Sequence, residues 1–444
     1  MAEPEANPTE KSQPEKEQNV KAVSRRNLFG IAGAGIALAG VGAAAGISIE
    51  KAVRDVRENG STALGSGSST ADAVVEFHGA HQAGIVTPAQ EHLHFAALDV
   101  TTNEREKLTQ LLRTWTNAAR RMTAGQEIVP DGATKGPLAA PPSDTGEALE
   151  LPASSLTLTI GFGPGIFDHR FGLSDLKPQE LADLPTFPQD KLDPNKSGGD
   201  LCIQACANDP QVAVHAIRNL VRLGFGTTQV RWSQLGFGRS SSTSRTQLTP
   251  RNLFGFKDGT NNLKAEDQNL LDQHVWVNKA DGPHWMDGGS YLIARRIRMH
   301  VETWDRAPLD EQQKIIGRSK GTGSPLGQTE EFDPVDLHVH GAGGEPLIPA
   351  DAHIRLASAE NLDGIKLLRR GYNFVDGSDG VGHLEAGLFF IAFVKDPAKQ
   401  FIPMQQALSS KDPMMEYVQH TGSALFAIPP GVQPNSFWGE ELFK

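Results

Sequence analysis

The sequence predicts an α+β fold made of two ferredoxin-like units, each a β-α-β-β-α-β repeat whose antiparallel sheet packs against that of the other unit. Two observations support this class. Segments of apolar residues typical of strands are interleaved with segments of helical period along most of the chain. Each half also contains an apolar strand candidate followed by an Asp-Pro pair that opens a helix, at Asp209-Pro210 and at Asp396-Pro397. This shared junction indicates a duplicated unit.

The first unit is expected over residues 71–245. Apolar residues recur with a helical period over Asn103–Met122. Leu156, Leu158 and Ile160 alternate with threonines in a strand that ends at a glycine-rich turn. The other expected elements are strands at His92–Val100, Leu201–Cys206 and Thr228–Leu235, and a helix from Asp209-Pro210 to about Leu223.

The second unit is expected over residues 246–444, where the same order of elements returns less regularly. Its expected strands are Tyr291–Val301, one near Gly371–Phe374, Leu388–Val394 and Phe426–Ile428, and its expected helices are Leu309–Ile316 and a segment from Asp396-Pro397 to about Leu408.

Residues 1–49 are expected to form an export signal. Ser24-Arg25-Arg26-Asn27-Leu28-Phe29 precedes an uncharged Gly/Ala-rich run that ends at Ile49, and paired arginines before a mildly apolar segment are typical of twin-arginine export. The alternative is a retained membrane anchor, because the run is long enough to span a bilayer, but its many glycines and alanines favour export with cleavage. We therefore expect transient contact with the twin-arginine machinery and a location in the periplasm, the cell envelope or the medium. Residues 50–70 are expected to be a flexible linker.

Composition excludes several function classes. The formal net charge of -11 argues against nucleic-acid binding, which needs a basic surface. Two cysteines in 444 residues exclude a disulfide scaffold, a cysteine zinc site and a thiolate iron–sulfur cluster. Cys202 and Cys206 would lie roughly 13 Å apart on one strand, too far for a disulfide, so we expect buried thiols rather than a redox pair. Redox chemistry in this chain therefore requires a cofactor.

Two stretches of the second half carry residues suited to chemistry. Asp258 stands between glycines in Gly255–Gly259, on a loop that a ligand can approach closely, although an Asp-Gly pair is also a common turn. His353 stands sixteen residues before Arg369, and it could equally be a structural imidazole. Two histidine pairs could each hold a metal but lack an evident third ligand: His92 with His94, and His338 with His340.

The order of these motifs resembles the dye-decolorizing peroxidase (DyP) family. Gly255-x-x-Asp258-Gly259 is followed about a hundred residues later by His353 and then by Arg369. Within the family, the twin-arginine signal and the Asp258-Gly259-Thr260 setting look most similar to the deferrochelatase/peroxidase of bacterial iron-uptake systems. The family's fold of two ferredoxin-like units agrees with the duplication described above. Four further segments carry the resemblance: His81–Ile85, Phe95–Asp99, Gly161–Gly165 and Gly288–Leu292.

The resemblance implies haem b (iron protoporphyrin IX) in the C-terminal unit, with His353 as the proximal iron ligand. Asp258 and Arg369 match the family's catalytic residues on the peroxide side. Arg318 looks like a partner for a haem propionate, with a surface salt bridge as the alternative. Other positions match segments that line the haem or wall its distal cavity: Gly259, Thr260, Asn261, Ser358, Ala359, Glu360, Leu388 and Phe390.

One position departs from the family pattern. Some members carry a distal asparagine two residues after the arginine, whereas this chain has Gly371, which leaves open whether Arg369 or Asp258 dominates. A hydrogen-bond acceptor should lie behind His353 and strengthen its bond to iron, but the sequence does not identify it.

Three functions follow from the resemblance. The first is a peroxidase that uses hydrogen peroxide to oxidise a reducing substrate, such as a dye, a phenolic compound or ferrous iron. The second is a deferrochelatase that releases iron from haem and leaves the porphyrin intact. The third is a non-catalytic haem carrier, which would have no use for a polar pair such as Asp258 and Arg369. Components of an iron-uptake system and further copies of the chain, in a homo-oligomer, are the expected protein partners.

Overall fold

The computed structural model describes residues 73–444, so the predicted signal (1–49) and linker (50–70) lie outside the described residues. Within residues 73–444, nine strands form a single sheet in the order β5-β9-β2-β3-β1-β4-β7-β8-β6, and β5 also pairs with β8. Every strand pairing is antiparallel. The coarse prediction of helices combined with an antiparallel sheet is therefore confirmed.

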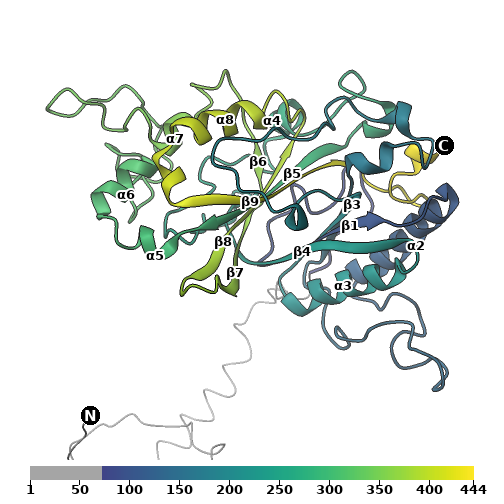
Figure 1. Cartoon of the computed structure of the whole chain (residues 1–444). Helices are drawn as coiled ribbons and strands as arrows, with labels where there is room; N and C mark the ends of the chain where they lie inside the picture. The colour runs from purple at the N-terminus through teal and green to yellow at the C-terminus, as the bar shows by residue number, and fades with distance from the viewer. Residues whose placement is uncertain (1–72) are drawn as a thin grey trace, which may run out of the picture. The chain divides into compact units, whose positions relative to one another are not determined.

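In the first half, α2 and α3 cover one face of the strands (Figure 1). Leu112 and Trp115 of α2 and Ile217 of α3 pack in one apolar cluster with Ile160 and Ile203 of the sheet. The strand order in this half is β4-β1-β3-β2. Its elements are β1 (His92–Val100), α2 (Arg105–Thr123), β2 (Thr157–Phe162), β3 (Leu201–Ala207), α3 (Pro210–Leu223) and β4 (Thr228–Arg239).

The second half contains more helices than the sequence predicts, because α4, α5 and α7 are short and have no clear period. Its strand order is β9-β5-β8-β7, with β6 pairing with β8 as well. The predicted helix Leu309–Ile316 is found as α6. The other elements are α4 (Gln268–His274), β5 (Ser290–Met299), α5 (Val301–Trp304), α7 (His353–Leu356), β6 (Leu368–Arg369), β7 (Tyr372–Ser378), β8 (Leu384–Val394), α8 (Phe401–Lys411) and β9 (Val418–Ile428).

The two halves are joined through strand edges as well as through a shared core. β2 pairs with β9 at Phe162 and Ala427, and β4 pairs with β7 at Phe237 and Asn373. The sheet faces also meet, because the ring of Phe95 on β1 lies 5.3 Å from that of Phe389 on β8 and 6.2 Å from that of Phe426 on β9. The sequence predicts the packed faces, but it contains no local signal for the edge pairings.

One of the two predicted Asp-Pro helix starts is confirmed. The carboxylate of Asp209 accepts a hydrogen bond of 2.7 Å from the backbone N–H of Gln211, and α3 begins at Pro210. The second prediction is wrong by four residues, because α8 begins at Phe401 rather than at Pro397. The carboxylate of Asp396 still caps the chain there, because it accepts from the N–H of Ala398 at 3.0 Å and of Lys399 at 3.1 Å, but residues 397–400 form a turn and not the first turn of α8.

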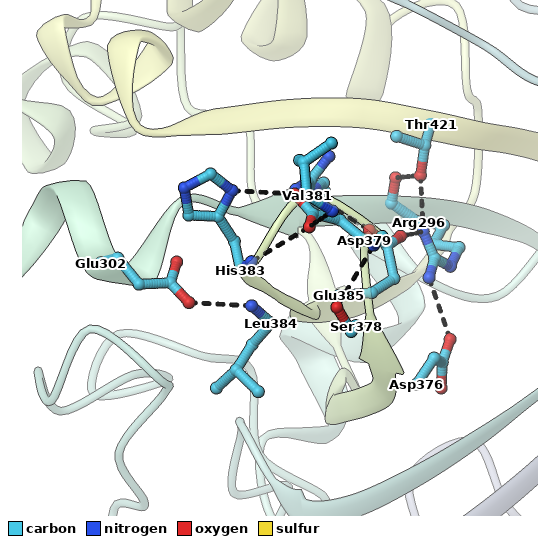
Figure 2. A network of polar contacts seen from close by, with 12 residues as sticks. Arg296, Glu302, Asp376, Ser378, Asp379, Val381, His383, Leu384, Glu385 and Thr421 are labelled. Carbon is cyan, nitrogen blue, oxygen red and sulfur yellow. Dashed lines mark hydrogen bonds and ion pairs between the residues drawn. The ribbon is translucent and has the colours of Figure 1, made fainter. Parts of the chain in front are cut away.

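Charged side chains tie the β7–β8 hairpin to its neighbours (Figure 2). Arg296 on β5 donates to Asp376 on the hairpin at 2.9 Å and to Glu385 on β8 at 2.8 Å. It also donates to the Thr421 hydroxyl on β9 at 2.9 Å. The guanidinium is 5% exposed, so these three acceptors compensate for its burial. The network fixes β8, which supplies side chains to the site described below.

Two further findings concern the cysteines and the helices of residues 73–444. Cys202 and Cys206 are free and buried, as predicted. Burial raises the pKa of the Cys202 thiol well above its ordinary value, so this thiol is inert. No helix between residues 73 and 444 combines the length and the apolar character needed to cross a bilayer.

Candidate active site

A cavity of about 290 Å³ lies in the second half, and every residue that lines it falls between Asn252 and His420. One wall is the face of β5, β8 and β9 that carries Ile297, Leu388 and Val418. This face is opposite to the one that carries the Phe389 core, because side chains alternate along a strand. Residues of α7 and α8 line the cavity as well. Sheet and helices thus enclose a largely apolar space with a small number of polar groups.

His353 lines this cavity at the first residue of α7. Its Nδ1 lies 2.6 Å from Oδ2 of Asp412, whose side chain is completely buried. The other carboxylate oxygen of Asp412 accepts a hydrogen bond of 2.8 Å from the N–H of Met414. Burial lowers the pKa of His353, but the charge and hydrogen bond of Asp412 outweigh it, so the net pKa is above the ordinary value. Asp412 orients the ring and leaves Nε2 for a ligand in the cavity.

Asp258 and Arg369 come together from positions 111 residues apart, and both line the cavity. Arg369 Nη1 donates to Asp258 Oδ1 at 2.6 Å. The second carboxylate oxygen, Oδ2, has only a long contact of 3.4 Å from the side-chain amide of Asn252. The pair therefore presents a fixed positive charge beside a carboxylate oxygen that makes no short hydrogen bond.

Two glycines allow the backbone to bring this pair together. Gly259 has a φ of +87°, and a Cβ at this position would lie 2.9 Å from the Cα of Ser241. A Cβ on Gly371 would lie 2.7 Å from the Ser240 hydroxyl and 3.2 Å from the carbonyl oxygen of Phe389. The structure thus gives a reason for the departure noted at Gly371: the loop after β4 comes too close to leave space for a side chain there.

Arg318 lines the cavity and is 7% exposed. Its Nη1 donates to the carbonyl oxygens of Gly323 at 2.7 Å and Glu331 at 3.1 Å. Burial lowers its pKa, and no carboxylate of residues 73–444 forms an ion pair with it. The surface salt bridge considered as an alternative is therefore not found, and a buried guanidinium remains available to an anionic ligand.

The structure brings together all but one of the predicted site residues. Glu360 does not line the cavity; its carboxylate accepts from Nε2 of the exposed His338 at 3.0 Å. The predicted residues that do line the cavity are Asp258, Gly259, Thr260, Asn261, Arg318, His353, Ser358, Ala359, Arg369, Leu388 and Phe390.

Asp412 and His420 also line the cavity, although the sequence did not single them out. Asp412 precedes Pro413 and caps the short helix that follows, so its Asp-Pro helix start is the signal that could have identified it. His420 is 3% exposed, and burial lowers its pKa to about 3, which makes it a neutral imidazole. Nothing near His420 in the sequence marks it as part of the site.

The histidine pairs considered as metal sites are not supported. Over the described part of the chain, no group of three or more His, Cys, Asp or Glu side chains is placed to hold a metal ion. His340 instead bonds through Nδ1 to the carbonyl oxygen of His338, at 2.7 Å.

Together these features define a largely apolar cavity that contains an imidazole nitrogen available to a ligand and a carboxylate–guanidinium pair, an arrangement suited to a haem enzyme. Two family models match the chain: Dyp-type peroxidase, N-terminal, over residues 82–238, and Dyp-type peroxidase, C-terminal, over residues 249–433. The chain belongs to the Dyp-type peroxidase family. The predicted resemblance is thereby confirmed, as is the prediction of a peroxidase with haem as its cofactor.

Curated relatives carry two names. The dye-decolorizing peroxidase of Thermobifida fusca is 38% identical over 440 residues, which cover 96% of this chain and 98% of the relative. The deferrochelatase of Escherichia coli K12 is 36% identical over 437 residues, which cover 96% of this chain and 99% of the relative. The deferrochelatase of Yersinia pseudotuberculosis is 38% identical over 374 residues, which cover 83% of this chain and 84% of the relative.

Solved structures agree with this assignment. Ferric DtpA from Streptomyces lividans superposes with a TM-score of 0.77 at 36% identity, covering 84% of this chain and 98% of that one. A DyP-type peroxidase from Cellulomonas bogoriensis superposes with a TM-score of 0.76 at 36% identity, covering 84% of this chain and 99% of that one.

Proposed function

We propose that the cavity holds haem b and that the chain uses hydrogen peroxide to oxidise dyes, phenolic compounds or ferrous iron. The observation that carries this proposal is the position of His353 in the cavity wall, with Nδ1 bonded to Asp412 and Nε2 left for iron. Hydrogen bonding of the second ring nitrogen to a buried carboxylate is the usual way to orient a metal-binding histidine and to make it a stronger donor.

The remaining wall residues fit haem in polarity and charge. Ile297, Leu388 and Phe390 supply an apolar surface for its flat face. Arg318, a buried cation with no ion pair among the described residues, is suited to a propionate. Gly259, Thr260, Asn261, Ser358 and Ala359 supply further contacts.

Haem would be held through His353 and would supply the redox-active iron that provides the electrons for cleavage of the O–O bond and takes the remaining oxygen. In the same cavity, Oδ2 of Asp258 can accept a proton from one oxygen of hydrogen peroxide and pass it to the other, the oxygen that is released as water. Arg369 stabilises the negative charge that develops on the departing oxygen, and it does so from a fixed position, because its Nη1 is bonded to Asp258. Asp412 holds the proton of His353 Nδ1 throughout.

A second candidate is release of iron from haem as a deferrochelatase. Relatives named deferrochelatase match the chain at 36–38% identity, and release of iron would use the haem site proposed here. The Asp258–Arg369 pair argues against a carrier, which requires no polar pair on the peroxide side. Analysis of the products distinguishes the peroxidase from the deferrochelatase. Metal-free porphyrin together with free iron supports the deferrochelatase, whereas an oxidised substrate together with intact haem supports the peroxidase.

The domain organisation, the export route and the protein partners of the chain are part of the same proposal. Strand orders β4-β1-β3-β2 and β9-β5-β8-β7 support a duplication of the ferredoxin-like unit, with units at 71–245 and 246–444 and haem in the second. Export by the twin-arginine route to the periplasm, the envelope or the medium rests on residues 24–49. Self-association into a homo-oligomer is supported by apolar side chains that β4 exposes, namely Val230, Leu235 and Phe237. Iron-uptake partners follow from the deferrochelatase relatives.

The proposal is tested by loading the purified protein with haem and measuring peroxide-dependent oxidation of a phenol and of ferrous iron. The expected result is turnover that disappears in His353→Ala, because this variant lacks the iron ligand. Full haem binding in His353→Ala would contradict the assignment of the ligand. A haem-loaded wild type without any reaction with peroxide would contradict the peroxidase.

A further inference from the structure

The loop that carries Asp258 continues into a buried asparagine, Asn262, that contacts the backbone of Arg369. The side-chain oxygen of Asn262 accepts from the N–H of Arg369 at 2.8 Å, and its Nδ2 donates to the carbonyl oxygen of Arg369, also at 2.8 Å. Nδ2 also donates to the carbonyl oxygen of Ser242 at 3.0 Å. Asn262 is 7% exposed, so water does not substitute readily for these bonds.

These contacts take the place of a missing strand. β6 consists of two residues, Leu368 and Arg369, and it pairs with β8 on one side only. The amide of Asn262 presents an N–H and a carbonyl oxygen in the geometry of a peptide group, so it satisfies both backbone groups of Arg369, as an adjacent strand would, and its second N–H donates to Ser242. The strand that carries the guanidinium is thereby fixed to the loop that carries the carboxylate.

Lys264 supports the contact between Asn262 and Arg369, because it binds Ser242, which also accepts a hydrogen bond from Asn262. Lys264 Nζ donates to the Ser242 carbonyl oxygen at 2.8 Å and to the Ser242 hydroxyl at 2.6 Å. It also lies 3.4 Å from the carbonyl oxygen of Gly259. Ser242 therefore accepts from both Asn262 and Lys264, and the loop after β4, the Asp258 loop and β6 meet at one buried point. Burial lowers the pKa of Lys264 to about 8, and the charge of Arg369 lowers it as well.

We propose that Asn262, supported by Ser242 and Lys264, is a positioning residue that sets the place of Arg369 relative to Asp258, and that it acts on peroxide only through Arg369. This inference rests on the peroxidase function proposed above. A catalytic group displaced by about 1 Å can cost about a hundredfold in rate. Loss of the asparagine contact is therefore expected to slow the reaction with peroxide even though every group that touches peroxide is retained.

The test compares Asn262→Ala with a matched control, Asn219→Ala. Asn219 is also a buried asparagine whose amide makes three hydrogen bonds, to Thr145 twice and to the carbonyl oxygen of His215, but it lies on α3 and does not line the cavity. Both variants lose a buried amide, so both are expected to lower the melting temperature. Only Asn262→Ala is expected to lower the rate constant of the haem-loaded protein with hydrogen peroxide, by about tenfold to a hundredfold.

Two readouts separate positioning from general loosening. Fluoride binding to the haem-loaded protein depends on a hydrogen-bond donor in the cavity, so its dissociation constant should rise in Asn262→Ala and stay unchanged in Asn219→Ala. In the background of Arg369→Ala, the change Asn262→Ala should have no further effect on the peroxide rate, because Asn262 acts through Arg369. Asn262→Asp, which keeps the acceptor for the Arg369 N–H but removes both donors, replaces the alanine variant where that variant does not fold.

The inference is overturned by equal effects of Asn262→Ala and Asn219→Ala on the peroxide rate, or by additive effects of Asn262→Ala and Arg369→Ala. Either outcome leaves the proposed function untouched as long as the wild type reacts with peroxide. A wild type that does not react would instead refute the proposed function itself.

Discussion

Replacing Asp412 by alanine is expected to weaken haem binding through His353. The carboxylate accepts from His353 Nδ1 at 2.6 Å and from the N–H of Met414 at 2.8 Å. Hydrogen bonds to a charged group contribute about 1.5–3 kcal/mol each, so the variant should lose roughly 3–6 kcal/mol of folding free energy. Loss of the group that orients a metal-binding histidine typically costs about tenfold to a hundredfold in metal affinity. Titration of the metal-free protein with haem, followed by absorption, measures this loss.

A matched control exists in the first half. Asp144 is also a fully buried carboxylate, and it accepts from His215 Nε2 at 2.7 Å, but it lies outside the cavity. Asp144→Ala should lower stability to a similar extent and leave the haem affinity unchanged. Asp412→Asn keeps an acceptor for the imidazole and should lose less affinity than alanine. An unchanged haem affinity in Asp412→Ala, or an equal loss in Asp144→Ala, would refute the reasoning.

Three further predictions concern a buried histidine, a glycine and an arginine. Burial lowers the pKa of His94 to about 4. The unfolded imidazole therefore takes up a proton below about pH 6.5, whereas the folded imidazole does not. This difference should reduce the free energy of unfolding by roughly 3 kcal/mol as the pH falls from about 6.5 to 4. Urea unfolding at several pH values should show a shallower pH dependence in His94→Gln, and an unaltered slope would contradict the prediction. Gly259→Ala should lower both the peroxide rate and the stability, because the added Cβ meets Ser241 at 2.9 Å. Gly344 has a similar φ of +87° but no neighbour within 4 Å, so Gly344→Ala should lower only the stability, by about 1–3 kcal/mol. Equal peroxide rates in the two variants would count against the close approach of the backbone at Gly259. Arg318→Met should weaken binding of haem but not of its dimethyl ester, which lacks the propionate charges, and an equal loss for both ligands would exclude a propionate contact.

Regular elements of the fold could be predicted from the sequence because their signals are local. The strand His92–Val100 and the helix Leu309–Ile316 have the predicted bounds, and the proline-started helix begins where Asp209 can cap it. The predicted strand from Tyr291 ends two residues early, because α5 begins at Val301. Periodicity indicates elements reliably, but it does not predict which strand edges meet across the two halves.

The site was only partly predictable, for a related reason. His353, Asp258 and Arg369 could be selected because they resemble a family pattern, and the structure brings all three to one cavity. Asp412 lies 59 residues from His353 and Asn262 lies 107 residues from Arg369, and contacts over such separations depend on tertiary packing. Glu360 was expected at the cavity from its place beside Ser358 and Ala359, but its side chain turns to His338 instead.

The most direct test of the account is the reaction of the haem-loaded protein with hydrogen peroxide, followed by rapid-mixing absorption, in wild type, Asp258→Ala and Arg369→Ala. The account predicts a fast change in wild type and a rate constant at least about a hundredfold lower in one or both variants, because a proton-transfer group or a fixed charge at a reacting oxygen each contributes about that much. Equal rates in all three proteins, each with full haem loading, would contradict the claim that this carboxylate–guanidinium pair performs the chemistry.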